Sequence, residues 1–94
     1  MLAIKYYFRP LGVNQVKAFT SSASAASAVG VQTYAVMLHA STDCYVNFGG
    51  TASATAGVFL QADEPYIFDI HPSEVISVIR KTADGNLEIS ELTQ

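Results

Sequence analysis

Two histidines, His39 and His71, are the first side chains in this sequence that could bind a metal or transfer a proton. A metal site needs converging ligands, usually at local spacings such as HxxxH or CxxC, and the sequence contains neither spacing. His39 follows an apolar run, and His71 precedes Pro72 in a turn. We therefore interpret both as structural histidines and predict neither a metal nor a cofactor.

Three acidic residues, Asp63, Glu64 and Asp69, have the chemistry of a general acid and base. The sequence places the first two in a turn and the third on a strand face, where carboxylates are usually solvated. The many serines and threonines lack a GxSxG setting, and Gly49-Gly50 lacks the spacing and the lysine of a phosphate-binding loop. These patterns predict that the protein is not an enzyme.

Cys44 is the one cysteine in the chain, so it cannot form an internal disulfide. It precedes Tyr45 and Val46 in an apolar run, where a thiol usually serves as a small core side chain. A reactive thiol would need a base and an electropositive setting. We expect Cys44 to be part of the core.

Composition and charge exclude several classes of protein. Half of the 94 residues are apolar and only 14% are charged, a composition that excludes intrinsic disorder. The net charge of −3 excludes binding of nucleic acid through bulk charge. Residues 1–42 hold three basic residues and no acid, whereas residues 43–94 hold two basic against eight acidic residues. No apolar run is long enough to cross a membrane, and Met1–Phe8 does not resemble an export signal. We expect synthesis in the cytoplasm.

Short apolar runs separated by turn residues occupy the chain from Val31 onward. They predict strands at residues 31–39, 44–48, 57–61, 66–70, 74–80 and 86–92. Asp84-Gly85, between the last two runs, predicts a tight hairpin in which glycine has positive φ. In the final run Leu87, Ile89 and Glu91 share one face. The fold predicted is all-β, a small antiparallel β-sandwich of jelly-roll-like type.

The sequence before residue 31 has a different character. Residues 1–19 are aromatic and basic, interrupted by Pro10 and Gly12, and we interpret them as an extended N-terminal arm or as the first strand or strands. Residues 20–30 are mostly serine and alanine, and predict a linker or a strand edge lying against another surface. Residues 31–94 would then form the sandwich domain.

A series of short motifs follows in order between Val36 and Glu91. After a hydrophobic strand come DCYVNFG, TASATA, FLQA, an aromatic strand ending near Asp69-Ile70, PSEVISVIR and ADGNL. In order and spacing this stretch resembles a family of small virion proteins of tailed bacteriophages. The resemblance covers more than half of the chain, excludes the first nineteen residues and implies a structural role, without a known active site.

The role expected from this resemblance is that of a capsid decoration (cement) protein on the virion surface. It would bind the major capsid protein and neighbouring copies of itself, with a trimer favoured among homo-oligomers. If about 17 residues of the arm were extended, they would reach roughly 55 Å. Aromatic side chains beside cations are typical interface anchors, so the expected partner-binding residues are Lys5, Tyr6, Tyr7, Phe8 and Arg9.

Two alternatives stay open at this point. The protein could instead occupy a head–tail joint, the tail or a fibre base. A small carbohydrate-binding module is a further alternative, because tyrosines can stack on sugars, although the chain has no tryptophan; these tyrosines are Tyr6, Tyr7, Tyr34, Tyr45 and Tyr66. Neither a nucleic acid nor a membrane is an expected partner.

Overall fold

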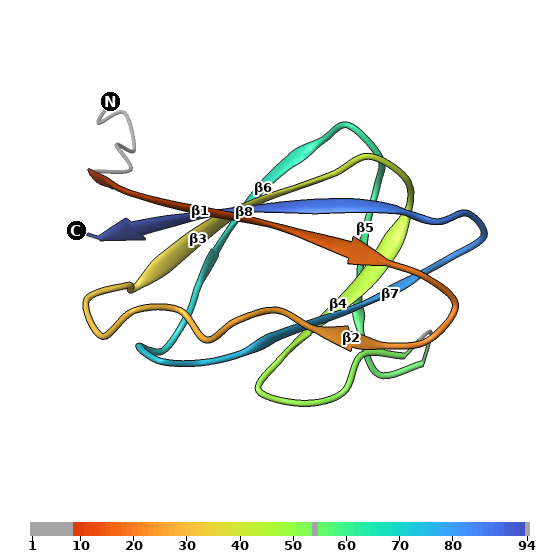
Figure 1. Cartoon of the computed structure of the whole chain (residues 1–94), viewed down its shortest axis with the longest axis horizontal. Coiled ribbons are helices and arrows are strands. Elements are labelled where there is room, and N and C mark those ends of the chain that lie inside the picture. Colours follow the sequence, from red (N-terminus) through yellow and green to blue (C-terminus); the bar gives the residue numbers. More distant parts are fainter. Residues whose placement is uncertain (1–8, 54, 94) are drawn as a thin grey trace, which may run out of the picture.

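The computed structural model describes residues 9–53 and 55–93, which form two packed four-stranded sheets (Figure 1). Every regular element in these residues is a strand. They contain no helix that is long and apolar enough to cross a membrane. The strands are β1 (Arg9–Phe19), β2 (Ser24–Ala25), β3 (Ala35–Ala40), β4 (Cys44–Phe48), β5 (Val58–Leu60), β6 (Pro65–Asp69), β7 (Ile76–Arg80) and β8 (Gly85–Thr93).

The strand order identifies the architecture. One sheet, sheet A, has the order β1-β8-β3-β6, and the other, sheet B, has the order β2-β7-β4-β5. The first strand pairs with the last, the second with the seventh, the third with the sixth and the fourth with the fifth, all antiparallel. This is a long β-hairpin folded over itself, which is the topology of a jelly roll. The predicted fold class is confirmed.

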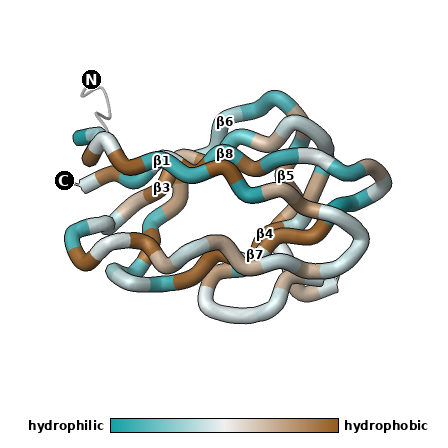
Figure 2. The backbone as a smooth tube through the Cα atoms, in the orientation of Figure 1, coloured by the Kyte–Doolittle hydropathy of each residue, from teal (hydrophilic) through white to brown (hydrophobic). Residues whose placement is uncertain are grey.

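The core lies between the two sheets because side chains alternate along each strand. In β3, Val36 and Leu38 point inward and are fully buried, whereas Met37 points outward. Hydrophobic positions concentrate on the strands, and the connection from β7 to β8 is mostly hydrophilic (Figure 2). The largest core side chains are Phe19, Leu38, Leu60, Ile76, Leu87 and Ile89.

The predicted hairpin at Asp84-Gly85 is wrong. The strands that flank it, β7 and β8, belong to different sheets, so their connection crosses the open end of the sandwich. Positive φ occurs at Gly12 and Gly49 among the described glycines, and not at Gly85. Gly85 is instead needed for space, because a Cβ there would lie 2.9 Å from Cζ of Phe19 and would also collide with the hydroxyls of Ser41 and Thr42.

Residues 9–19 adopt the strand alternative. They form β1, which pairs along sheet A with β8, as Figure 1 shows for the two ends of the chain. The register is interrupted between Pro10 and Asn14, where Gly12 has φ +73°. Of the segment interpreted as an arm, only residues 1–8 lie outside the described structure.

The Ser/Ala-rich segment is also part of the sandwich. Ser24–Ala25 forms β2, which pairs with β7, and the buried side chains of Ala26 and Val29 join the core. Small side chains allow this segment to pack closely at the edge of sheet B, where β2 is the outermost strand. The sandwich therefore extends from Arg9 to Thr93, and no domain boundary lies at residue 31.

Candidate functional site

The sequence-predicted partner-binding residues fall at the start of the chain. Lys5, Tyr6, Tyr7 and Phe8 lie outside the described residues. Arg9 is exposed, opens β1 and pairs with Thr93 near the end of β8. The structure thus places only Arg9, the last residue of the predicted binding segment, at the start of an edge strand.

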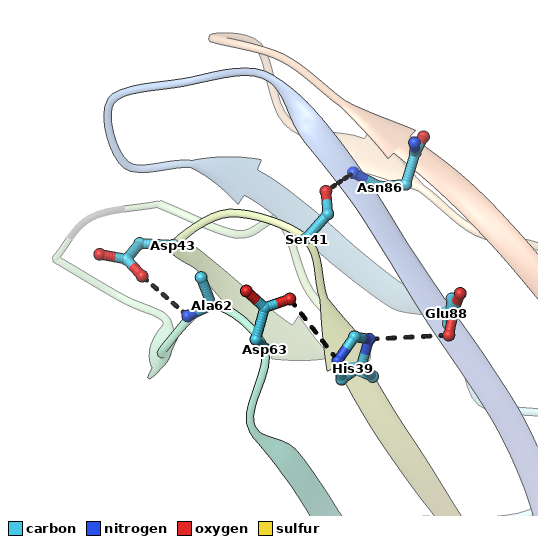
Figure 3. Close-up of polar contacts among 7 residues, drawn as sticks. All are labelled: His39, Ser41, Asp43, Ala62, Asp63, Asn86 and Glu88. Atoms are coloured by element: carbon cyan, nitrogen blue, oxygen red, sulfur yellow. Dashed lines mark hydrogen bonds and ion pairs between the residues drawn. The ribbon is translucent and has the colours of Figure 1, made fainter.

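His39 lies between two carboxylates on the outer face of sheet A (Figure 3). Its Nε2 is 3.9 Å from Oδ1 of Asp63, in the turn between β5 and β6, and its Nδ1 is 3.6 Å from Oε1 of Glu88 on β8. Both separations are those of ion pairs when the imidazole carries a proton. The arrangement joins three elements at the surface.

Backbone contacts hold these elements in place around His39. Asp63 adopts φ 62°, and its N–H donates to the carbonyl of Ala40 at 2.8 Å. The N–H of Ala62 donates to Oδ1 of Asp43 at 2.8 Å, and the N–H of Asn86 donates to Oγ of Ser41 at 2.9 Å (Figure 3). These bonds fix the loops at one end of the sandwich, next to His39 on β3 (Figure 3).

The acidic residues considered for acid–base chemistry do not converge. Asp63 and Glu64 precede β6, whereas Asp69 is its last residue. The two ends of β6 are about 13 Å apart, so Asp69 is at the far end of the strand from Asp63 and Glu64. In the described part of the chain, no three His, Cys, Asp or Glu side chains are grouped to hold a metal ion.

Cys44 is fully buried at the start of β4, as predicted for a core thiol. Burial, and to a smaller extent the neighbouring Asp43 carboxylate, raises the pKa of Cys44 to about 11. The thiol is therefore protonated at neutral pH and is a poor nucleophile.

Exposed apolar side chains gather on the outer face of sheet A. Met37 pairs with Ile67 on β6 and with Ser90 on β8, so these three point to the same side of the sheet. Val16 on β1 pairs with Glu88, two residues from Ser90, and reaches the same face with 65% of its surface exposed. We call Val16, Met37 and Ile67 the sheet A patch.

The described tyrosines do not form one sugar-binding surface. Tyr66 stacks on Phe68 with ring centroids 6.1 Å apart, and both pack against the core. Tyr34 precedes β3 and is exposed, whereas Tyr45 is on β4, where its ring lies 5.7 Å from that of Phe59. Lys81 Nζ lies 5.0 Å from the centre of the Phe59 ring, on the outer side of sheet B.

Glu91 is a buried acid that sequence analysis placed on the same strand face as Leu87 and Ile89 without assigning it a role. Only 4% of its surface is exposed, beside a cavity that also includes Thr33 and Gly30. The signal available in the sequence was its alternation with Leu87 and Ile89 along β8.

No known protein family, no curated protein and no solved structure matches this chain.

Proposed function

We propose that this chain is a structural protein of a tailed-bacteriophage virion that decorates and stabilises the assembled head shell. The observation that carries the proposal is the set of large apolar side chains left exposed on sheet A and along β1. Val16 and Ile67 belong to the sheet A patch, and Val13 adds a half-exposed side chain on β1. Exposed apolar surface of this kind favours a protein that functions bound to a partner.

The position of β1 supplies a second means of attachment. It ends the strand order of sheet A, so its outer edge has no neighbouring strand among residues 9–53 and 55–93. A long edge with free N–H and C=O groups can accept an added strand from another chain. The shell protein would cover both this edge and the sheet A patch.

Two further arguments support a virion role. The motifs between Val36 and Glu91 resemble those of small phage virion proteins. The jelly roll is also a fold that recurs in viral capsid proteins and in lectins, which is support by analogy only.

The proposed action is mechanical. Binding buries apolar surface at the shell and stabilises the assembled form, because the protein binds that form more tightly than the free subunits. No covalent bond is made or broken in this role. The partners proposed are the major capsid protein and other copies of this chain, on the surface of the virion.

Cosedimentation with heads assembled in the absence of this protein tests the proposal. We expect the wild-type chain to bind until its sites are saturated and to raise the temperature at which the heads rupture. Val16→Asn and Ile67→Asn should each weaken binding, whereas Val58→Asn, on sheet B, should not. Normal circular dichroism must accompany each variant. Failure of the correctly folded wild-type chain to bind the heads would refute the proposal.

The copy number in purified particles separates decoration from the nearest alternative. Decoration of a shell predicts on the order of hundreds of copies, and a head–tail joint, tail or fibre-base position predicts about twelve or fewer in a ring. Gel densitometry against the major capsid protein gives this number.

The outer face of sheet B favours carbohydrate binding as a second candidate function. Tyr45 and Phe59 present two rings there, with Lys81 beside Phe59, and aromatic faces can stack on sugars. A glycan array with the isolated chain tests this possibility. Binding that is lost in Phe59→Ala would favour the carbohydrate module, and a blank array would exclude it for the glycans tested.

A further inference from the structure

A cavity of about 280 Å³ lies beside the irregular start of β1. Leu11 and Val13 form one side, where Gly12 interrupts the register with β8. Residues 30–33 form the other side, and Val31 is three-quarters exposed there. Leu11, Val13 and Val31 give the cavity apolar walls, and it forms a short groove that opens at the edge of sheet A.

The acid in this cavity has unused bonding capacity. Oε1 of Glu91 accepts hydrogen bonds from the Gly30 N–H at 2.9 Å and from the Thr33 hydroxyl at 2.6 Å. Its other oxygen, Oε2, accepts none from the described residues, and none of their ion pairs includes Glu91. Buried carboxylates are normally paired. A carboxylate at the base of an apolar groove suits the ammonium group of a lysine whose aliphatic stem packs along the walls.

The segment that precedes β1 carries such a side chain. Residues 1–8 read MLAIKYYF, and Lys5 is the one charged side chain among them. The remaining residues are apolar or aromatic, which matches the walls formed by Leu11, Val13 and Val31. When extended, eight residues reach roughly 26 Å at about 3.3 Å each.

The sequence favours a neighbouring chain over the same chain as the source of this lysine. To reach its own cavity, Lys5 would have to return past Leu11, which requires a reversal between residues 5 and 11. Three consecutive aromatic residues favour extended backbone there, Pro10 disfavours a helical conformation at Arg9, and residues 1–11 contain no glycine. If residues 5–11 were fully extended, Lys5 would be roughly 20 Å from Leu11, too far to enter its own cavity.

We propose that the cavity at Glu91 is the receptor for residues 1–8 of a second copy, with the Lys5 ammonium paired to the Glu91 carboxylate. The inference deepens the proposed function, since it assigns a self-association site to the segment expected to contact partners. The segment and the cavity are different surfaces, so the contact is head-to-tail, and it closes a ring such as a trimer when the rotation permits.

Charge-neutral variants of the two proposed partners test the contact in solution, without any shell. We expect Lys5→Gln and Glu91→Gln each to weaken self-association about 10- to 100-fold, as measured by sedimentation equilibrium, because a hydrogen bond between charged groups is lost. Glutamine retains the acceptor for Gly30 and Thr33, so the fold should survive. The matched controls Lys17→Gln and Glu64→Gln should associate like the wild type. A monomeric wild type, or equal effects in controls and test variants, would overturn the inference.

Disulfide trapping decides which chain supplies the segment. With Cys44 buried, the double variant Lys5→Cys/Val31→Cys should form covalent dimers and larger species on a non-reducing gel after mild oxidation. Lys5→Cys/Phe59→Cys, with the second thiol on sheet B, should not. A double variant that links only within one chain, or does not link, would contradict the second-copy assignment. A wild-type chain that stays monomeric but still binds heads would overturn this inference and leave the proposed function standing.

Discussion

The side-chain amide of Gln15 and the main chain of Ser27 exchange two hydrogen bonds. Nε2 of Gln15 donates to the Ser27 carbonyl at 3.1 Å, and the Ser27 N–H donates to Oε1 of Gln15 at 3.1 Å. Gln15 is on β1 in sheet A, and Ser27 follows β2 in sheet B. One side chain therefore joins the two sheets along an edge of the sandwich.

Replacing Gln15 with alanine should weaken this edge. Two exposed hydrogen bonds are lost, so we expect Gln15→Ala to lower the free energy of unfolding by about 1 kcal/mol. Urea denaturation followed by circular dichroism measures the change. Gln61→Ala is the control, since Gln61 is exposed and its side chain makes no hydrogen bond within the described structure. Equal losses of unfolding free energy in the two variants would mean that the hydrogen bonds between Gln15 and Ser27 contribute nothing to stability.

Gly85→Ala tests the close packing at the beginning of β8. The added methyl would meet Phe19 and the Ser41 hydroxyl at less than ordinary contact distance, so we expect a loss of about 1–3 kcal/mol. At Gly30, a methyl would have only ordinary contacts at 3.5 Å, and Gly30→Ala should cost much less. Thermal denaturation compares the stabilities of the two variants. A Gly85→Ala protein as stable as the wild type would contradict the expected loss.

Thr33→Val tests the support of the buried acid. The substitution keeps the shape of the side chain but removes the hydroxyl that donates to Glu91 at 2.6 Å. Because a buried carboxylate loses a donor, the free energy of unfolding should fall by about 1.5–3 kcal/mol. Thr33→Ser retains the hydroxyl and should be the more stable of the two variants. Urea denaturation of both proteins distinguishes the lost hydrogen bond from a change in packing.

Alkaline pH should destabilise the fold through Cys44. Its pKa is raised from 9.0 to about 11 in the folded protein. Above pH 9 the unfolded chain loses the thiol proton while the folded chain keeps it, so stability is lost as the pH rises from 9 to 11. The linked loss is roughly 2–3 kcal/mol.

Cys44→Ala provides the comparison for this pH dependence. The slope of melting temperature against pH between 9 and 11 should be smaller in the variant, whatever its absolute stability. All other ionisable side chains are the same in both proteins, so their effects on stability cancel in the comparison. Identical slopes would show that the buried thiol does not contribute.

Local pattern was enough to locate most of the strands. Cys44–Phe48 has the predicted bounds, and the strands after it differ from prediction by only a few residues. This succeeded because apolar residues alternate within each run and turn residues separate the runs. The same alternation placed Glu91 on one face with Leu87 and Ile89, but its donors Gly30 and Thr33 lie about sixty residues earlier, and no local pattern connects them.

The failure at Asp84-Gly85 has a specific cause. The dipeptide is a strong local signal for a tight hairpin, but β7 pairs with β4 and β8 pairs with β3, in opposite sheets. Position 85 needs glycine because a Cβ there would collide with the ring of Phe19, which is 66 positions away in the chain. Tertiary packing, and not turn chemistry, requires glycine there.

The amino-acid sequence alone determined where most strands after residue 31 lie and which side chains of a strand share a face, since both follow from a period of two along the chain. Only the tertiary structure decided which sheet each strand joins, that Arg9–Phe19 pairs with the last strand, and that Glu91 lies beside a cavity at the edge of β1. Alternation depends only on neighbouring residues in the sequence. Strand pairing joins segments that are far apart in the chain, and no local pattern in either segment identifies its partner.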